Sequence, residues 1–217
     1  MPKRKEPKEK NVNLRNQPKR CRWCTDDPLY QQYHDQEWGV PVYEDQALFE
    51  RLALEGMQAG LSWLTVLKKR QAMRERFHNF DIVWLAEFGG TRMESWLQDP
   101  ALIRHRGKLE ALVHNAGLVL ELQHAADEGD AFARLLWGFA PEVHVPRQTG
   151  DVPTYTEDAL RMAKFLKRRM FKFVGPTTCY AFMQSVGMVN GHTRDCFAYA
   201  LHKHAWENSY RKIPAVD

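Results

Sequence analysis

Glu55 is the side chain whose sequence surroundings most favour chemistry. The apolar residues Leu48, Leu52 and Ala59 recur at helical spacing, and Glu55 falls on the same stripe. A carboxylate on such a stripe is costly to bury unless it is paired or accepts hydrogen bonds. The stripe therefore predicts either an acid at the floor of a pocket or a cap or ion pair with a basic core residue.

Two glycines one helical turn apart, Gly56 and Gly60, lie beside this acid. Glycine destabilises a helix interior by roughly 1 kcal/mol relative to alanine, and it is tolerated where another group must approach the backbone closely. The approaching group is either a flat ligand above Glu55 or a second helix that packs against the first.

A second set of residues has the types and spacing of a metal site. His192 and Cys196 are four residues apart, so both can face one point from a single helical turn. Cys21 supplies a third ligand, with Cys24 or His34 as the fourth, and spacing alone favours the Cys21-x-x-Cys24 pair. Four protein ligands are typical of structural zinc, because they leave no open position for a substrate. The alternative is a group of buried thiols and hydrogen-bonded histidines.

Aromatic residues are interleaved with acids between residues 20 and 39, at Trp23, Tyr30, Tyr33 and Trp38. The faces of such rings stack on a flat guest that is electron-poor or cationic. The same four residues are also consistent with a packed cluster that only holds the N-terminal segment against the core.

A basic helix near residue 170 is followed by a tight turn through Gly175 and by a new apolar helix from Thr177 and Thr178. The free backbone N–H groups of such a turn bind anions, and Lys172 lies beside them. This is the layout of a helix-hairpin-helix that holds a DNA phosphate without reading sequence, which assigns DNA contacts to Lys172, Gly175 and Thr177. The alternative is an ordinary helical corner with solvated charges.

Helices must position all of these groups, because no segment shows the convincing alternation of apolar and polar residues, with period two, that is typical of a strand. We therefore expect an all-α fold. We also expect a helix over 61–77, with its basic residues, including Arg70, facing solvent. Proline and glycine predict a loop over 140–155. The expected helix N-caps are Asp45, Asp81, Thr91 with Glu94, Asp99, Asp130 and Thr156, and a longer helix is expected over 106–126.

The charge of the chain is concentrated at its N-terminus. Eight lysines and arginines against two glutamates give residues 1–20 a net charge of +6, and the formal +4 of the whole chain leaves −2 for the rest. We expect a disordered tail over 1–20 that adds non-specific attraction to phosphate, a helical domain over 21–200 and a C-terminal extension over 201–217. No apolar run approaches the ~20 residues of a membrane span, and no signal peptide follows the basic start, which indicates the cytoplasm and reduced cysteines.

Taken together, these stretches closely resemble the 3-methyladenine DNA glycosylase I family. The likeness covers residues 20–200, in order and with little change of spacing. The segments that carry it are Cys21-x-Trp23, Asp27-Pro28-Leu29-Tyr30, Tyr33-His34-Asp35-x-Glu37-Trp38-Gly39-Val40-Pro41, Leu54-Glu55-Gly56-x-Gln58-Ala59-Gly60-Leu61-Ser62-Trp63, Arg104-His105-Arg106-Gly107-Lys108 and Phe171-Lys172-Phe173-Val174-Gly175.

The resemblance implies an all-helical, helix-hairpin-helix glycosylase that acts as a monomer on double-stranded alkylated DNA. It implies a structural zinc held by Cys21, His34, His192 and Cys196, so that His34 replaces Cys24 as the fourth ligand. The base pocket that it implies consists of Glu55, Tyr30, Tyr33 and Trp63, with Trp23 and Trp38 close by.

The implied reaction is the excision of adenine methylated at N3, with 3-methylguanine open as a second substrate. Such a purine is cationic in DNA, so its glycosidic bond is weak and it leaves as a neutral base. Extruding the nucleotide costs a few kcal/mol, and aromatic stacking favours the cation by about 1–2 kcal/mol. Glu55 would accept hydrogen bonds from the base edge while water attacks the sugar carbon. No obvious lysine nucleophile follows the hairpin, which argues against a lyase step.

Asp195 lies where many helix-hairpin-helix glycosylases carry a catalytic aspartate, but it falls between two expected zinc ligands, and we favour Glu55 as the functional acid. Two other classes of function fit the sequence. One is a reader that binds alkylated DNA without cleaving it. The other is a zinc-stapled interaction protein in which the aromatic residues are only core.

Overall fold

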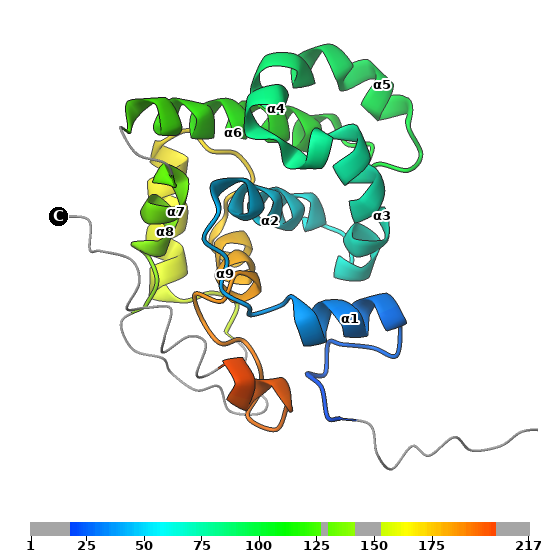
Figure 1. Cartoon of the computed structure of the whole chain (residues 1–217), viewed down its shortest axis with the longest axis vertical. Helices are drawn as coiled ribbons and strands as arrows, with labels where there is room; N and C mark the ends of the chain where they lie inside the picture. The colour runs from blue at the N-terminus through cyan, green and yellow to red at the C-terminus, as the bar shows by residue number, and fades with distance from the viewer. Residues whose placement is uncertain (1–17, 127–129, 142–152, 203–217) are drawn as a thin grey trace, which may run out of the picture.

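The computed structural model describes residues 18–126, 130–141 and 153–202 (Figure 1). These residues form helices and no strand, which confirms the all-α prediction. The helices are α1 (Pro28–Gln36), α2 (Asp45–Gln58), α3 (Trp63–Arg76), α4 (Ile82–Phe88), α5 (Met93–Gln98), α6 (Arg106–Ala125), α7 (Ala131–Trp137), α8 (Glu157–Arg168) and α9 (Pro176–Ser185), with 3-10 turns η2 (His78–Phe80) and η3 (Gly89–Arg92). In this part of the chain, no helix combines the length and apolar character that crossing a membrane requires.

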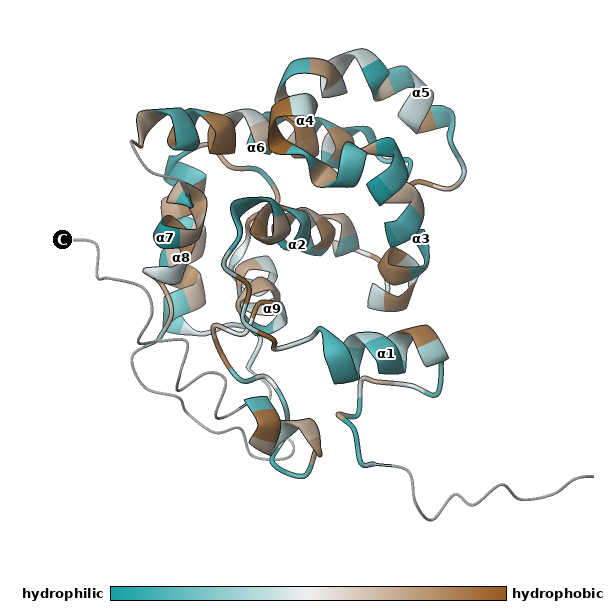
Figure 2. Cartoon of the chain, in the orientation of Figure 1, coloured by the Kyte–Doolittle hydropathy of each residue, from teal (hydrophilic) through white to brown (hydrophobic). Residues whose placement is uncertain are grey.

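Helix α2 lies at the centre of the molecule and contacts α3, α6, α7 and α9. Its residues Leu48, Leu52 and Leu54 are buried, and Figure 2 shows hydrophobic segments along both α2 and α9. Burial of this apolar surface is the main favourable contribution to folding. Because Glu55 lies near the C-terminal end of α2, the same packing brings it against α9.

The stretch from α2 to α3 is broken by a turn at Gly60, whose φ of +77° favours glycine. Ala59, expected on the buried stripe, lies beyond the last residue of α2 and is exposed. The Lys108 ammonium group of α6 donates to the carbonyl oxygens of Met57 (2.8 Å) and Ala59 (2.6 Å) and so fixes the end of α2. Ser62 then caps α3 by accepting a hydrogen bond from the Thr65 N–H group.

Two of the predicted caps are confirmed and two are wrong. Asp81 caps α4, and Thr156 caps α8 by accepting from the Ala159 N–H group. Thr91 does not cap α5, because α4 continues directly into η3 and the Thr91 hydroxyl donates to the Phe88 carbonyl oxygen. Asp99 accepts from the Ala101 N–H group in a turn that does not lead into a helix.

The remaining two caps are wrong in a related way. Asp45 is buried as the first residue of α2, and its carboxylate accepts from the N–H groups of Phe132 (3.2 Å) and Ala133 (2.7 Å) in α7. Asp130, directly before α7, has a left-handed backbone and makes no capping hydrogen bond. A residue remote in sequence therefore caps α7, because the packing of α2 against α7 places a carboxylate at its free N–H groups.

We expect Asp45→Asn to lower the free energy of unfolding by about 1–3 kcal/mol, because an amide cannot accept from all of these donors. The matched control is Asp130→Asn, since asparagine tolerates the left-handed conformation, and it should change stability by less than about 0.5 kcal/mol. Denaturant unfolding measures both changes. Equal losses for the two variants would contradict this capping assignment.

Arg70 is buried, with 7% of its surface exposed, so the prediction that it faces solvent was wrong. Its guanidinium group donates to Glu50 (2.8 Å) and to Glu37 (2.6 Å), and Arg51 also donates to Glu37 (2.9 Å). Burial disfavours the charged acids, but the arginine hydrogen bonds outweigh it and lower the pKa of both Glu37 and Glu50. Helices α1, α2 and α3 are thus joined by paired charges, which periodicity in one helix cannot predict.

Candidate functional site

A cavity of about 200 Å³ opens between α1, α2, α3 and α9. All six pocket residues named from the sequence line it, and Gln58, Ala181 and Gln184 do so as well. The sequence gives little signal for these three, apart from the position of Gln58 about one helical turn beyond Glu55. The full lining is Trp23, Tyr30, Tyr33, Trp38, Glu55, Gln58, Trp63, Ala181 and Gln184.

The aromatic residues pack against one another and also form the pocket wall. The ring centroids of Trp23 and Trp38 are 4.8 Å apart at 78°, and those of Tyr33 and Trp63 are 5.3 Å apart at 51°. The Tyr33 hydroxyl and the Trp63 indole nitrogen are buried, and neither finds a hydrogen-bond partner among the described residues. Because buried polar groups nearly always have partners, these two donors favour a guest that carries acceptors.

Glu55 is 6% exposed and is the only acid in the lining of this pocket, as far as the described residues extend. Burial raises the pKa of its carboxyl group to about 8, although the charge of Arg51 and a hydrogen bond with Ser185 act in the opposite direction. Arg51 donates its hydrogen bond to Glu37. Of the two predictions made for Glu55, this favours an acid at the floor of a pocket over a buried ion pair with a basic residue. Burial therefore favours the protonated form of free Glu55, and a cationic guest favours the carboxylate.

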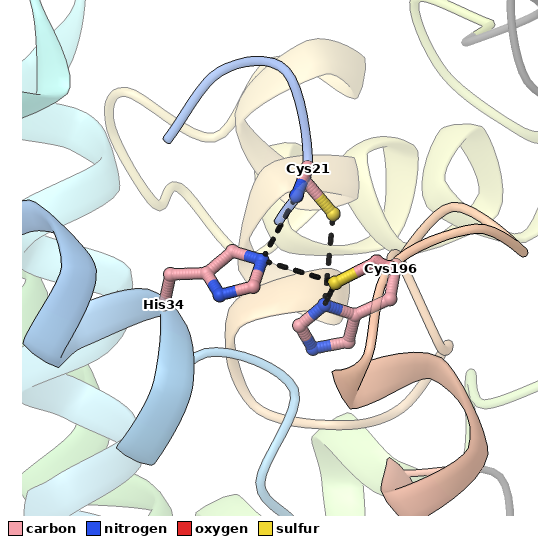
Figure 3. Close-up of side chains that lie close together, drawn as sticks. Cys21, His34 and Cys196 are labelled. Carbon is pink, nitrogen blue, oxygen red and sulfur yellow. Dashed lines mark hydrogen bonds between the residues drawn. The ribbon is translucent and has the colours of Figure 1, made fainter. Parts of the chain in front are cut away.

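Cys21, His34, His192 and Cys196 lie together in one buried cluster, with their four candidate ligand atoms within 4.8 Å of one another. The Cys196 sulfur is 3.5 Å from Nε2 of His34 and 3.6 Å from Nδ1 of His192, and the Cys21 sulfur is 3.6 Å from the same Nδ1 (Figure 3). Zinc bonds of about 2.0–2.3 Å in a tetrahedron give ligand separations of about 3.3–3.8 Å. These three separations therefore fit a zinc site, and two cysteines with two histidines are a donor set that structural zinc takes.

The other ring nitrogens of the two histidines are also engaged. Nδ1 of His34 lies 2.8 Å from Asp35, which Arg20 holds through two guanidinium nitrogens. Nε2 of His192 lies 3.2 Å from the Trp38 carbonyl oxygen. Such outer partners orient metal-binding imidazoles, and here they leave one nitrogen of each ring directed at the sulfurs.

Cys24 lies outside this cluster, half-buried, with its thiol near the Thr25 carbonyl oxygen. The fold therefore does not bring Cys24 to the other candidate ligands, as spacing alone had favoured, and the four residues that it brings together are those implied by the resemblance. His192 and Cys196 do converge, but through an irregular turn and not through the helical turn expected from their spacing.

The expected boundary at residue 200 falls inside a helical turn over 198–202. His202 is buried there and stacks on His192 with ring centroids 4.7 Å apart, so the body extends beyond that boundary. Residues 1–17 of the expected tail and 203–217 of the expected extension lie outside the described residues, as does most of the expected loop over 140–155.

The turn between α8 and α9 carries the residues assigned to DNA contact. Lys172 and Thr177 are exposed, and Gly175 caps α9, which begins at Pro176 and not at Thr177. The Asn115 amide of α6 pins this turn, since it donates to the Lys172 carbonyl oxygen (3.0 Å) and accepts from the Lys172 N–H group (2.9 Å).

Gly56 faces the same turn. A Cβ atom built on Gly56 would lie 3.3 Å from Cβ of Phe173, so this turn is the group that approaches the α2 backbone. Both predicted alternatives, a flat ligand and a second helix, were therefore wrong for Gly56. The aromatic cavity is consequently lined by Glu55, and the exposed turn packs against the next residue of the same helix, Gly56.

Asp195 lies outside the pocket lining and pairs with Lys19 at 2.7 Å. Hydrogen bonds from Lys19 and Thr193 lower the pKa of its carboxyl group to about 2. A charge-paired, strongly acidic group is a poor general base, and this position favours Glu55 as the functional acid.

A model of the methyladenine glycosylase family matches residues 23–199. The chain is 45% identical to the DNA-3-methyladenine glycosylase 1 of Escherichia coli (strain K12) over 187 residues, covering 85% of this chain and 98% of that protein. It is 46% identical to the DNA-3-methyladenine glycosylase of Haemophilus influenzae over 82% of this chain and 96% of that protein.

Solved structures agree with this similarity. A crystal structure of 3-methyladenine DNA glycosylase I matches with a TM-score of 0.77 at 46% identity and covers 82% of this chain and 98% of that one. The Staphylococcus aureus 3-methyladenine DNA glycosylase I matches with a TM-score of 0.74 at 36% identity, over 81% of this chain and 93% of that one. This chain belongs to the methyladenine glycosylase family.

Proposed function

We propose that this protein is a DNA repair enzyme that excises 3-methyladenine from alkylated DNA by hydrolysing the N-glycosidic bond. The observation that carries this proposal is the aromatic cavity with the buried acid Glu55, in a chain 45% identical to a DNA-3-methyladenine glycosylase. We expect the enzyme to act as a monomer in the cytoplasm.

We expect the pocket to favour a cationic purine over a neutral one. The base, extruded from the duplex, would stack on the rings of Tyr33 and Trp63. Its positive charge would favour the ionised form of Glu55, whose carboxylate then accepts hydrogen bonds from the base edge. Because the methylated base leaves as a neutral molecule, binding and orientation are sufficient for hydrolysis by water. The described pocket lining contains no lysine, in keeping with a monofunctional enzyme.

We further propose that zinc binds to Cys21, His34, His192 and Cys196 and has a structural role. The four side chains would supply four protein ligands, the number typical of structural zinc, and so would leave no position for a substrate. The metal would join the segment before α1 to the segment after α9, which lie on the same side of the molecule in Figure 1.

The turn between α8 and α9 is proposed to contact DNA as a helix-hairpin-helix. We expect Lys172→Ala to weaken binding similarly on different sequences and to reduce the slope of log K against log salt by about 0.9, because it removes one phosphate contact. The matched control Lys172→Arg keeps the charge and should keep the slope. Titrations at several salt concentrations on two unrelated duplexes measure the effect. A loss that depends on the sequence would contradict a phosphate contact.

The proposed activity is tested by incubating the protein with methylated double-stranded DNA and identifying the released bases by chromatography. We expect free 3-methyladenine and an intact sugar–phosphate backbone, and the same assay decides whether 3-methylguanine is released. Tight binding without release would identify a reader of alkylated DNA. Neither binding nor release would favour an interaction protein with an aromatic core.

A further inference from the structure

Helix α6 carries two buried polar side chains, Lys108 and Asn115, which have 6% and 7% of their surface exposed. They are seven residues apart, which is about two helical turns, so they lie on the same face of the helix. Buried polar groups nearly always have hydrogen-bond partners. Here the partners are backbone groups of two other elements, α2 for Lys108 and the turn between α8 and α9 for Asn115.

Lys108 binds the end of α2. Its ammonium group donates to the carbonyl oxygens of Met57 (2.8 Å) and Ala59 (2.6 Å), and carbonyl groups at the end of a helix lack partners within it. Gln58 lies between these two residues, and its side chain lines the aromatic cavity together with Glu55. Lys108 therefore fixes the last turn of α2, from which two side chains reach the pocket.

Asn115 binds the exposed turn at Lys172, where its amide donates to the carbonyl oxygen (3.0 Å) and accepts from the N–H group (2.9 Å). Nε2 of the neighbouring His114 lies 2.9 Å from the Met170 carbonyl oxygen. The turn contains two residues with a left-handed backbone, Met170 (φ +65°) and Phe173 (φ +57°). This conformation is unfavourable for residues other than glycine, so the contacts from α6 offset a local cost.

The end of α2, the face of α6 and the turn pack closely against one another. The cavity among them has a volume of about 20 Å³, enough for roughly one water molecule, and its lining includes Gly56, Lys108, Asn115, Lys172 and Phe173. A Cβ atom built on Gly56 would lie 3.3 Å from Cβ of Phe173. A displacement of the turn would therefore disturb the end of α2 as well.

We propose that Lys108 and Asn115 are positioning residues for base excision. Asn115 holds the turn in the conformation that contacts DNA, and Lys108 holds the last turn of α2 for binding of the base. Neither residue is in the lining of the aromatic cavity formed by the described residues, so each acts through the element that it binds. The inference rests on the proposed function and on the DNA contact proposed for the turn.

Asn115→Ala should weaken binding of methylated duplex DNA about tenfold, if the turn then adopts its DNA-contacting conformation in about a tenth of the molecules. The slope of log K against log salt should not change, because no phosphate contact is removed, whereas Lys172→Ala lowers that slope. Binding of free 3-methyladenine requires only the pocket and should match the wild type. Asn115→Leu has a similar volume and lacks both donor and acceptor, so it tests the same loss where the alanine variant fails to fold.

Lys108→Met has nearly the same length and no donor. We expect its affinity for free 3-methyladenine to fall about tenfold, because the last turn of α2 loses two hydrogen bonds. The salt slope of DNA binding should stay at the wild-type value, since the buried ammonium group contacts protein carbonyl groups. Lys108→Gln keeps a donor and should lose less affinity than Lys108→Met.

Calorimetric titration with the free base and fluorescence anisotropy with duplex DNA at several salt concentrations measure these effects. The matched control is Glu121→Gln, an exposed position on the same helix, which should change neither titration. A residue that only stabilised the fold would leave both affinities of the folded protein unchanged, and that result would overturn the inference. A lower salt slope in Asn115→Ala would also overturn it, because Asn115 would then contact phosphate itself.

Failure of this inference differs from failure of the proposed function. A wild-type protein that binds DNA and the free base, but releases no base from DNA, contradicts the function, and the variant titrations still decide the inference. Normal base release by the wild type, with unchanged affinities in the Asn115 and Lys108 variants, overturns the inference and keeps the function.

Discussion

Glu55→Gln is expected to weaken binding of free 3-methyladenine and to slow its excision by roughly ten- to a hundred-and-fifty-fold, the equivalent of about 1.5–3 kcal/mol for a hydrogen bond to a charged group. An amide of the same shape presents a donor where the base requires an acceptor, and it carries no charge to favour a cation. Much of the loss should appear as poorer discrimination against undamaged adenine, because the bond to the methylated base is already labile.

Ligand titration and single-turnover excision should be measured side by side for this variant. Trp63→Ala is the companion variant and should weaken binding of the same base through lost stacking. Fold and metal content of the Glu55 variant should match those of the wild type. If Glu55→Gln binds the free base normally and yet abolishes excision, Glu55 acts as a general base and the selectivity account is wrong.

Cys196→Ser and Cys21→Ser are expected to lose zinc and to lower the free energy of unfolding by several kcal/mol. Structural zinc contributes its binding free energy to folding, and that energy is about 10–16 kcal/mol in zinc-finger peptides. Metal analysis of wild-type protein purified without added zinc should give about one zinc per chain.

Cys24→Ser is the matched control for these variants, since Cys24 is three residues from Cys21 and lies outside the buried cluster. It should keep both the metal and the stability. Loss of zinc in Cys24→Ser together with its retention in His34→Ala would show that the fourth ligand has been misassigned.

Helix caps mark the limit of what local sequence predicts in this chain. Asp81 and Thr156 cap the helices that directly follow them, so the donors and the acceptor share one short segment. Asp45 satisfies donors that are 87 and 88 residues away, and only the packing of α2 against α7 creates that arrangement. Arg70 was misassigned for the same reason, because its carboxylate partners lie on other elements.

The pocket was better predicted than the caps. Glu55 was identified because a carboxylate on an apolar stripe is costly to bury without a partner. The clustered aromatic residues gave a second indication of a pocket. Gln184 and Gln58 gave no comparable signal, since a polar residue in a helix is ordinary until its neighbours are known. Spacing alone could not decide between Cys24 and His34, because the answer depends on which of the two side chains the fold directs toward the other candidate ligands.

The pocket wall and the cysteine–histidine cluster touch directly. The rings of Trp23 and His34 are 5.2 Å apart, and those of Trp38 and His192 are 4.6 Å apart. If zinc occupies the cluster, an occupied metal site holds two walls of the pocket in place, and the two binding equilibria become thermodynamically linked. Linkage is reciprocal, so any factor by which zinc tightens the binding of the base is also the factor by which the base tightens the binding of zinc against a chelator. A repair enzyme of this construction would retain its metal best while it is engaged with damage.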